Sequence, residues 1–376
     1  MCGEYEYREK CYKYGWVQDS SKVPSIPTYE NPHRRKPNKC DQCDYFAAQK
    51  RTLDKHLKRN HGCVTPNPKS NISSNAILFN GGATYTPDEM TQRYMDAKTF
   101  IVAAHEGDVK IVRRKLVEGV DVNVKYEFWG GDTALHTACR EGHDEVVELL
   151  IKNGAELNVT DKDGATALHK ACTWGHDKAV EMLIKNGADL NVTNEDGATA
   201  LHKACTWGHD KAVEMLIKNG ADLNVTDKNG DTALHYVCSY GHDKVVELLI
   251  KNGADINVTN EYGDTALHEA CRRDHDKVVD LVLKNGADLN VTNKNGDTAL
   301  HQACWRGHDK VVELLIKNGA YLNLIDKAGE TALHKACFHK HDKVVELLLK
   351  NGADLNVTDK NENTALHEAC RRDSSA

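Results

Sequence analysis

Two cysteines and two histidines near the start of the chain are spaced as ligands of one metal ion. Cys40 and Cys43 are separated by two residues, His56 and His61 by four, and twelve residues lie between the two pairs. Two thiolates on a hairpin and two imidazoles on a helix at this spacing close a tetrahedral zinc site. A segment as short as residues 37–62 is not expected to fold without the metal. The sequence therefore predicts one structural Zn²⁺.

The stretch CDQCDYFAAQKRTLDKHLKRNH resembles a two-Cys, two-His zinc finger. All four ligands match the positions of that family, and Leu53 stands where its core leucine does. Two core positions depart from the pattern, because Ala47 and Asn38 replace the usual aromatic residues. Tyr45 or Phe46 would have to fill the small core instead. The resemblance implies a ββα finger around the metal.

The finger is basic in an acidic chain. From His33 to His61 there are nine Lys or Arg and three Asp, a net of +6, whereas the whole chain carries −7. Such a segment suits contact with phosphates. A single finger reads only about three base pairs, so sequence-specific recognition by this finger alone is not expected. Auxiliary contact with DNA or RNA, or with a protein, remains open, and the resemblance implies that the base-reading positions are Gln49, Arg51, Thr52 and Lys55.

A repeat dominates the rest of the sequence. The motif Thr-Ala-Leu-His occurs eight times at a spacing of 33 residues, first at Thr133 and last at Thr364. One stretch, DGATALHKACTWGHDKAVEMLIKNGADLNVT, occurs twice unchanged, at residues 163–193 and 196–226. A catalytic site needs one constellation of residues, whereas copied segments build a surface from equivalent units. The period therefore favours a repeat architecture.

Each unit is predicted to form a helix, a turn, a second helix and a loop. Thr133 can cap the first helix with its hydroxyl, and Gly142 can end that helix in the left-handed conformation. Asp144 falls in the first turn of the second helix, where a negative charge suits the helix dipole. Asn153 and Gly154 end the second helix. One unit buries too little apolar surface to fold alone, whereas stacked units share a core.

The run DTALHTACREGHDEVVELLIKNGAELNVT resembles an ankyrin repeat, and the likeness covers residues 97–376. The family usually has Pro after the first Thr of the motif, where every copy here has Ala. The resemblance implies an all-α solenoid with a degenerate first repeat at 97–126 and seven full repeats from residue 131. The last repeat, 362–376, lacks its second helix, so the sequence is expected to be a fragment of a longer chain unless this half-unit suffices as a cap.

Two segments have the composition of connectors. Residues 1–36 are polar and rich in Tyr without periodicity, and we expect a disordered N-terminal segment. Residues 63–96 contain the Pro, Ser, Asn and Gly of a flexible linker.

Eight of the thirteen cysteines recur every 33 residues in the frame TALHxxC. Equivalent atoms of stacked helices lie roughly 10 Å apart, beyond the Cα separation of about 7 Å that a disulfide can bridge. We therefore expect free, buried thiols in an intracellular compartment, the cytoplasm or the nucleus. His136 and Cys139 could share a metal, but the ankyrin resemblance implies that this histidine instead bonds loop backbone between units.

The copies differ most at the residue after TALH and at the two residues after the cysteine. In the ankyrin fold these positions face the concave side, and Trp, Tyr and Arg are the residues that most often carry binding energy. The predicted partner-binding residues are Arg140, Lys170, Trp174, Lys203, Trp207, Tyr236, Tyr240, Arg272, Arg273, Trp305, Arg306, Phe338 and His339.

Three functions are compatible with these observations. The first is a non-enzymatic scaffold that binds a protein on the concave face and carries a zinc finger, with no membrane segment and no small-molecule substrate. The second is a transcriptional regulator that uses the finger for auxiliary DNA or RNA contact. The third is the recruiting arm of a longer enzyme or channel. Phosphate-binding glycine loops and nucleophile elbows are not found in the sequence, so no catalytic residues are predicted.

Overall fold

The computed structural model describes residues 77–78, 84–85, 87–126 and 129–371. The chain divides into two compact units, Met1–Pro87 and Asp88–Ala376. The predicted finger, its four zinc ligands, its base-reading positions and the N-terminal segment all lie outside the described residues. Apart from one short hairpin, nearly all the described residues belong to the second unit.

The segment expected to be a flexible linker contains regular structure. Strand β1 (Ile77–Leu78) pairs antiparallel with β2 (Thr84–Tyr85). Helix α3 (Pro87–Glu106) then begins ten residues before the expected boundary at 97, so the linker prediction is wrong over residues 87–96. Proline is favourable at the first position of a helix, and neither Gly nor Pro interrupts the rest of α3. Asp96 within this stretch pairs with Lys115 of α4 at 2.7 Å.

The second unit is a stack of helix pairs, as the 33-residue period predicts. Helices α3 and α4 (Val109–Val117) form the first, degenerate repeat. Seven pairs follow, and then a single helix, α19 (Ala365–Arg371). The pairs are α5 (Ala134–Glu141) with α6 (Asp144–Lys152), α7 (Ala167–Trp174) with α8 (Asp177–Lys185), α9 (Ala200–Trp207) with α10 (Asp210–Lys218), α11 (Ala233–Tyr240) with α12 (Asp243–Lys251), α13 (Ala266–Arg272) with α14 (Asp276–Lys284), α15 (Ala299–Arg306) with α16 (Asp309–Lys317), and α17 (Ala332–Phe338) with α18 (Asp342–Lys350).

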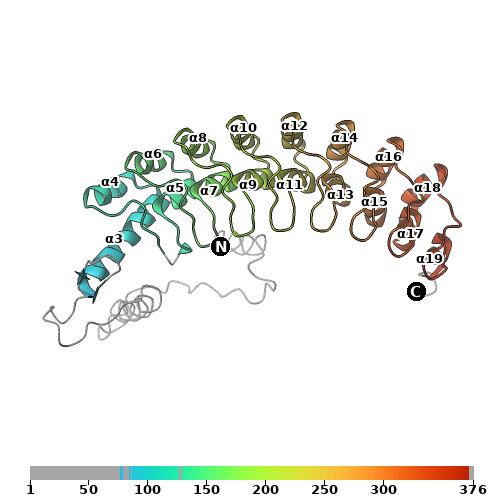
Figure 1. The fold of residues 1–376 in the computed structure, drawn as a ribbon, viewed down its shortest axis with the longest axis horizontal. Coiled ribbons are helices and arrows are strands. Elements are labelled where there is room, and N and C mark those ends of the chain that lie inside the picture. Colours follow the sequence, from blue (N-terminus) through green and yellow to red (C-terminus); the bar gives the residue numbers. More distant parts are fainter. Residues whose placement is uncertain (1–76, 79–83, 86, 127–128, 372–376) are drawn as a thin grey trace, which may run out of the picture. The chain divides into compact units, whose positions relative to one another are not determined.

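Figure 1 shows two rows of helices in this unit. The even-numbered helices from α4 to α18 form the outer row, on the convex side of the arc, and the odd-numbered helices from α5 to α17 form the inner row. Hairpin loops extend from the inner row on the side away from the outer helices. None of the helices that the structure describes is both long and apolar enough to cross a membrane.

The predicted helix boundaries of a unit are confirmed. The hydroxyl of Thr133 accepts a hydrogen bond from the backbone of His136, which caps α5. Gly142 ends α5 with φ at 73°, in the left-handed region that glycine adopts at low cost. Asp144 opens α6 and Asn153 caps its C-terminus.

The core runs through all the repeats between the two rows of helices. Each full repeat contributes a buried leucine from the inner helix, such as Leu168, and buried residues from the outer helix, such as Val180 and Leu183. The seven repeated cysteines from Cys139 to Cys337 are buried and free, as predicted. The eighth, Cys370 in α19, is free but exposed, so the prediction of burial is wrong there; among the described residues no helix follows α19 to cover it. Burial raises the pKa of the seven buried thiols, as at Cys139, so they stay protonated. They therefore act as small apolar groups.

Candidate functional site: the concave face

Histidines fix the inner helices to one another. In the first full repeat, Nδ1 of His136 accepts the backbone N–H of Thr133 at 3.2 Å, and Nε2 donates to the carbonyl of Ala165 in the next repeat at 3.0 Å. The histidine of the Gly-His-Asp turn also bridges repeats, because His176 Nε2 donates to the carbonyl of Arg140 at 2.9 Å. The loop-bonding role implied by the ankyrin resemblance is confirmed. Among residues 87–126 and 129–371, no cluster of His, Cys, Asp and Glu is arranged to hold a metal ion.

The tips of the hairpin loops, which are residues 161–164, 194–197 and their equivalents in the other repeats, form one edge of the concave face. Each tip donates a backbone hydrogen bond to the tip before it, as from Glu195 to the carbonyl of Asp163 at 2.8 Å and from Lys294 to that of Tyr262 at 2.8 Å. Inside a tip, one Asp or Asn side chain ties the turn, because Asp161 Oδ1 accepts from the backbone N–H groups of Asp163 and Ala165. These bonds hold the tips in register beside the inner helices.

Four predicted contact residues are large aromatic side chains exposed to solvent. The exposed fractions are 50% for Trp174, 47% for Trp207, 54% for Tyr240 and 40% for Trp305. The first three occupy the same position in three consecutive repeats, two residues after the cysteine. Large apolar surfaces that recur on one face of a protein mark an interaction site more often than scattered exposed residues do.

Several other predicted contact residues are bound within the protein. Lys170 forms an ion pair with the buried carboxylate of Asp161. The hydroxyl of Tyr236 donates to the equivalent Asp227 at 2.8 Å. In both repeats, the side chain that follows the TALH motif binds an aspartate of the hairpin loop nine residues earlier in the chain. This contact stabilises the loop against the inner helix.

Two of the four predicted arginines, Arg140 and Arg272, are also bound. Arg140 pairs with Asp132, which is 1% exposed. Arg272 lies between Glu269 and Asp264, at 3.8 Å from the latter. Together with Lys170 and Tyr236, these side chains hold the concave face in shape, and their direct contact with a partner stays a prediction.

The remaining predicted residues differ in exposure. Lys203 lies in a helix with the same sequence as that of Lys170. The hairpin loop before it has Asn194 at the position of Asp161, and Lys203 makes no ion pair with any described residue. Arg273 and Arg306 are exposed, and the guanidinium of Arg306 lies 4.5 Å from the centre of the Trp305 ring. Phe338 and His339 are half-buried, and their rings meet edge to face at 4.9 Å.

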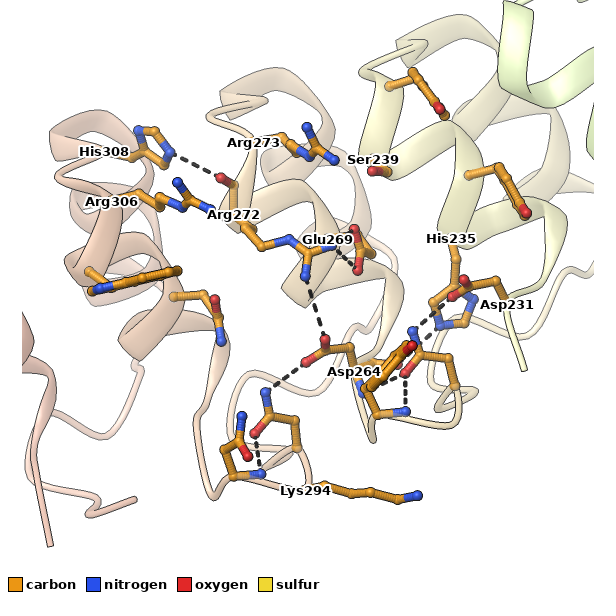
Figure 2. A pocket seen from close by; sticks show the side chains of 18 residues that line it. Asp231, His235, Ser239, Asp264, Glu269, Arg272, Arg273, Lys294, Arg306 and His308 are labelled. Atoms are coloured by element: carbon orange, nitrogen blue, oxygen red, sulfur yellow. Dashed lines mark hydrogen bonds and ion pairs between the residues drawn. The ribbon is translucent and has the colours of Figure 1, made fainter. Parts of the chain in front are cut away.

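A groove of about 860 Å³ opens on the concave face between α11 and α15. Its walls come from the inner helices, through Tyr240, Arg273 and Trp305, and from the hairpin tips, through Tyr262 and Lys294. Figure 2 shows the lining side chains and the pairing of Arg272. Sequence reasoning missed Tyr262, which is 61% exposed. Its signal was a bulky aromatic residue at a tip position that holds Gly, Asp, Asn or Ala in the other repeats.

The carboxylates of the groove are bound within the protein, whereas three of its cations, Arg273, Lys294 and Arg306, face solvent. Asp264 is 6% exposed and pairs with Arg272, and Asp231 accepts from the side chain of Asn260 at 2.8 Å. Burial raises the pKa of Asp231, which further reduces its tendency to carry a charge. Arg273 and Arg306 remain exposed at the surface of the groove. A ligand in this groove would therefore meet aromatic rings and positive charge.

The chain was compared with known protein families and with characterised proteins. A family model described as ankyrin repeats (3 copies) matches residues 100–194, 186–260, 221–293, 252–326 and 319–376, which together leave no gap from 100 to 376. The chain is 37% identical over 82 residues to the 2-5A-dependent ribonuclease of Mus musculus, which covers 21% of the chain and 11% of the ribonuclease.

Two further relatives carry the same repeats. The human ankyrin repeat domain-containing protein 40 is 40% identical over 62 residues, which is 16% of the chain and 17% of that protein. An ankyrin repeat-containing protein of Schizosaccharomyces pombe is 32% identical over 63 residues, or 17% of the chain and 30% of the relative. The chain therefore matches less than a third of the length of each of these proteins.

Proposed function

Because the chain belongs to the ankyrin-repeat family, we propose that it is a non-enzymatic scaffold that binds a protein partner on its concave face. The observation that carries this proposal is the row of exposed aromatic side chains at Trp174, Trp207 and Tyr240. Aromatic anchors of this kind supply much of the binding energy in protein interfaces. The hairpin tips and bridging histidines hold these residues on a rigid surface, which limits the entropy lost on binding.

The rings of Trp174, Trp207 and Tyr240 lie outside the buried core, although that of Tyr240 stacks on the ring of His242 at a centroid distance of 6.3 Å. The core of the same repeats is formed by buried residues such as Leu168, Leu201 and Leu234. Removing the indole of Trp174 or Trp207 would therefore leave that core intact. Solvent contact with large apolar groups is unfavourable, so a surface that retains them in consecutive repeats fits a bound partner.

The test compares what three forms of the full chain retain from a cell extract. The forms are the unchanged chain, the variant Trp174→Ala with Trp207→Ala, and a control with Glu181→Ala and Lys185→Ala on the outer helix α8. Quantitative mass spectrometry should identify proteins retained by the unchanged chain and the control but not by the double tryptophan variant. Identical retention by all three forms would contradict the proposal.

We also propose that Cys40, Cys43, His56 and His61 hold one structural Zn²⁺. Support comes from the order and spacing of the four ligands, which match a tetrahedral site. Zinc would supply the folding energy of the short finger and no catalytic chemistry. The basic charge of this segment favours a role in auxiliary nucleic-acid contact, through Gln49, Arg51, Thr52 and Lys55, in addition to the protein contact of the repeats.

A further inference from the structure

The exposed side chains of the concave face change in character along the stack. The position two residues after the repeated cysteine is aromatic in three consecutive repeats, as Trp174, Trp207 and Tyr240. In the next two repeats the same position holds Arg273 and Arg306. We call the first three residues the aromatic ladder and the last two the cationic ladder. All five side chains are exposed. The face therefore offers an apolar half followed by a positively charged half.

The hairpin tips beside the two ladders carry exposed groups of both signs. In the repeats of the aromatic ladder these are Lys162, Asp163, Glu195, Asp196 and Lys228. In the repeats of the cationic ladder they are Glu261 and Lys294. Two acids inside the groove, Asp264 and Glu269, are buried and pair with Arg272. The change from apolar to positively charged side chains along the face is therefore made by the two ladders themselves.

The spacing of the ladders suits a particular backbone conformation. Packed helices lie about 8–10 Å apart, so neighbouring rungs of a ladder are separated by roughly this distance. A polyproline II segment rises about 3.1 Å per residue with three residues per turn, so every third side chain returns to the same face after about 9 Å. One residue in three of such a segment would therefore meet one repeat. Proline-rich segments in this conformation also dock on surfaces lined with aromatic side chains.

We propose that the concave face binds an extended proline-rich segment of a partner protein, with apolar residues at every third position over the aromatic ladder and Asp or Glu at every third position over the cationic ladder. This inference rests on the proposed function, since it assigns the chemistry of the partner that the scaffold holds. Carboxylates pair with Arg in two-point hydrogen bonds, which gives specificity as well as attraction. The ring of Trp305 beneath Arg306 holds that guanidinium in place for such a contact.

A single-stranded nucleic acid is the other polymer that stacks on aromatic residues and pairs with Arg. The charges favour the peptide. A nucleic acid carries a phosphate at every residue, but the aromatic ladder itself offers no positive charge, and in the tips beside it the phosphates would meet Glu195 and Asp196 as well as Lys162 and Lys228. A peptide can be acidic at one end and neutral at the other, which matches the asymmetry of the face.

The test measures binding of labelled synthetic peptides to the full chain by fluorescence anisotropy. The probe has three Pro-Pro-Leu triplets followed by three Pro-Pro-Glu triplets. One comparison peptide has Lys in place of Glu, and another has the same composition with its three Glu residues adjacent. We expect the probe to bind about tenfold more tightly than the lysine peptide and several-fold more tightly than the peptide with adjacent Glu. Equal binding of the probe and the lysine peptide would overturn the proposal.

Charge reversal on the protein tests the site. Arg273→Glu with Arg306→Glu should reverse the preference, so that the lysine peptide binds better than the probe. The matched control, Lys277→Glu with Lys310→Glu, makes the same change in exposed residues of the outer helices α14 and α16 and should keep the original preference. Arg273→Gln with Arg306→Gln provides a milder variant, which should abolish the preference if the reversed form does not fold. An unchanged preference in the arginine variants would also overturn the proposal.

Two further measurements separate the alternatives. Trp174→Ala with Trp207→Ala should weaken binding of the probe about tenfold, and no weakening would contradict the role of the aromatic ladder. An oligothymidylate that binds through the same residues more tightly than the probe would overturn the proposal in favour of nucleic acid. If the peptides show no charge preference while the tryptophan variant still loses retained proteins, concave binding stands and only the assignment of the partner's chemistry fails.

Discussion

His169 joins two consecutive repeats through both nitrogens of its ring. Its Nδ1 accepts the backbone N–H of Thr166 at 3.1 Å, and its Nε2 donates to the carbonyl of Ala198, 29 residues further on, at 3.1 Å. The side chain is 2% exposed. The same pair of bonds recurs in the other full repeats, so the spacing of the concave side chains depends on a column of buried histidines.

Replacing this histidine should destabilise the stack. His169→Ala leaves the carbonyl of Ala198 and the backbone N–H of Thr166 without their buried partners, which costs about 1–3 kcal/mol each. The free energy of unfolding in urea should fall by at least about 2 kcal/mol. Lys178→Ala, an exposed change on the outer helix of the same repeat, should alter it by less than about 0.5 kcal/mol. A loss no larger than that of the control would contradict the bridging role.

Acid should destabilise the protein before its carboxylates titrate. Burial lowers the pKa of His169 and of His301 to about 4 from the ordinary 6.5. The unfolded chain therefore binds more protons than the folded one between pH 6.5 and 4, so stability is fully present above pH 6.5 and falls as the pH falls. The loss approaches about 1.4 kcal/mol per pH unit for each such histidine.

Two acids act in the opposite sense at the lower end of this range. Burial raises the pKa of Asp231 and Asp297 above 3.8, so the folded state binds their protons more readily. The loss of stability caused by the histidines is therefore best measured from pH 7.5 to 5, by following the urea concentration at the midpoint of unfolding. A midpoint that does not change over this interval would show that the buried histidines do not stay neutral.

Substitution of two glycines by alanine distinguishes the cost of backbone strain from the cost of a steric clash. Both Gly175 and Gly187 have positive φ, at 71° and 86°. An added Cβ at Gly175 would lie 2.5 Å from the ring of His209, whereas at Gly187 it would meet no atom within 4 Å. Gly187→Ala should therefore cost about 1 kcal/mol from strain alone, and Gly175→Ala should cost about 1–3 kcal/mol more. Equal losses in thermal melting would indicate that the inter-repeat histidine moves aside freely.

The zinc assignment is tested on the full chain by elemental analysis. The purified protein should contain one zinc per chain, and Cys43→Ser should lose it. The matched control Cys63→Ser, at a cysteine outside the ligand spacing, should retain the metal. Equal zinc content in both variants would exclude the predicted ligand set.

Most of the solenoid could be predicted from the sequence, because its local signals repeat. Thr133, Gly142 and Asn153 mark helix ends through capping and backbone preference, and each signal recurs every 33 residues. The start of α3 was missed, since its first residues stand outside the period and follow a stretch rich in turn residues.

The concave face was predicted only in part. Lys170 and Lys203 occupy identical helices, yet only Lys170 forms an ion pair, because Asp161 precedes it by nine residues where Asn194 precedes Lys203. Whether such a lysine is available to a partner therefore depends on the residue of the hairpin loop that lies against it. The contact between loop and helix forms only in the folded structure. The exposed tryptophans were found because a large aromatic residue at a variable position is a signal that needs no knowledge of the loop.

The most direct test of concave binding is the affinity of a purified partner for the double variant Trp174→Ala with Trp207→Ala. If both indoles contact the partner, the binding free energy should weaken by about 2 kcal/mol or more, a loss of roughly 30-fold in Kd, while the melting temperature stays within a few degrees of that of the unchanged chain. Glu181→Ala with Lys185→Ala, on the outer helix, should leave Kd unchanged. A double tryptophan variant that melts normally and binds as tightly as the unchanged chain would contradict binding on the concave face.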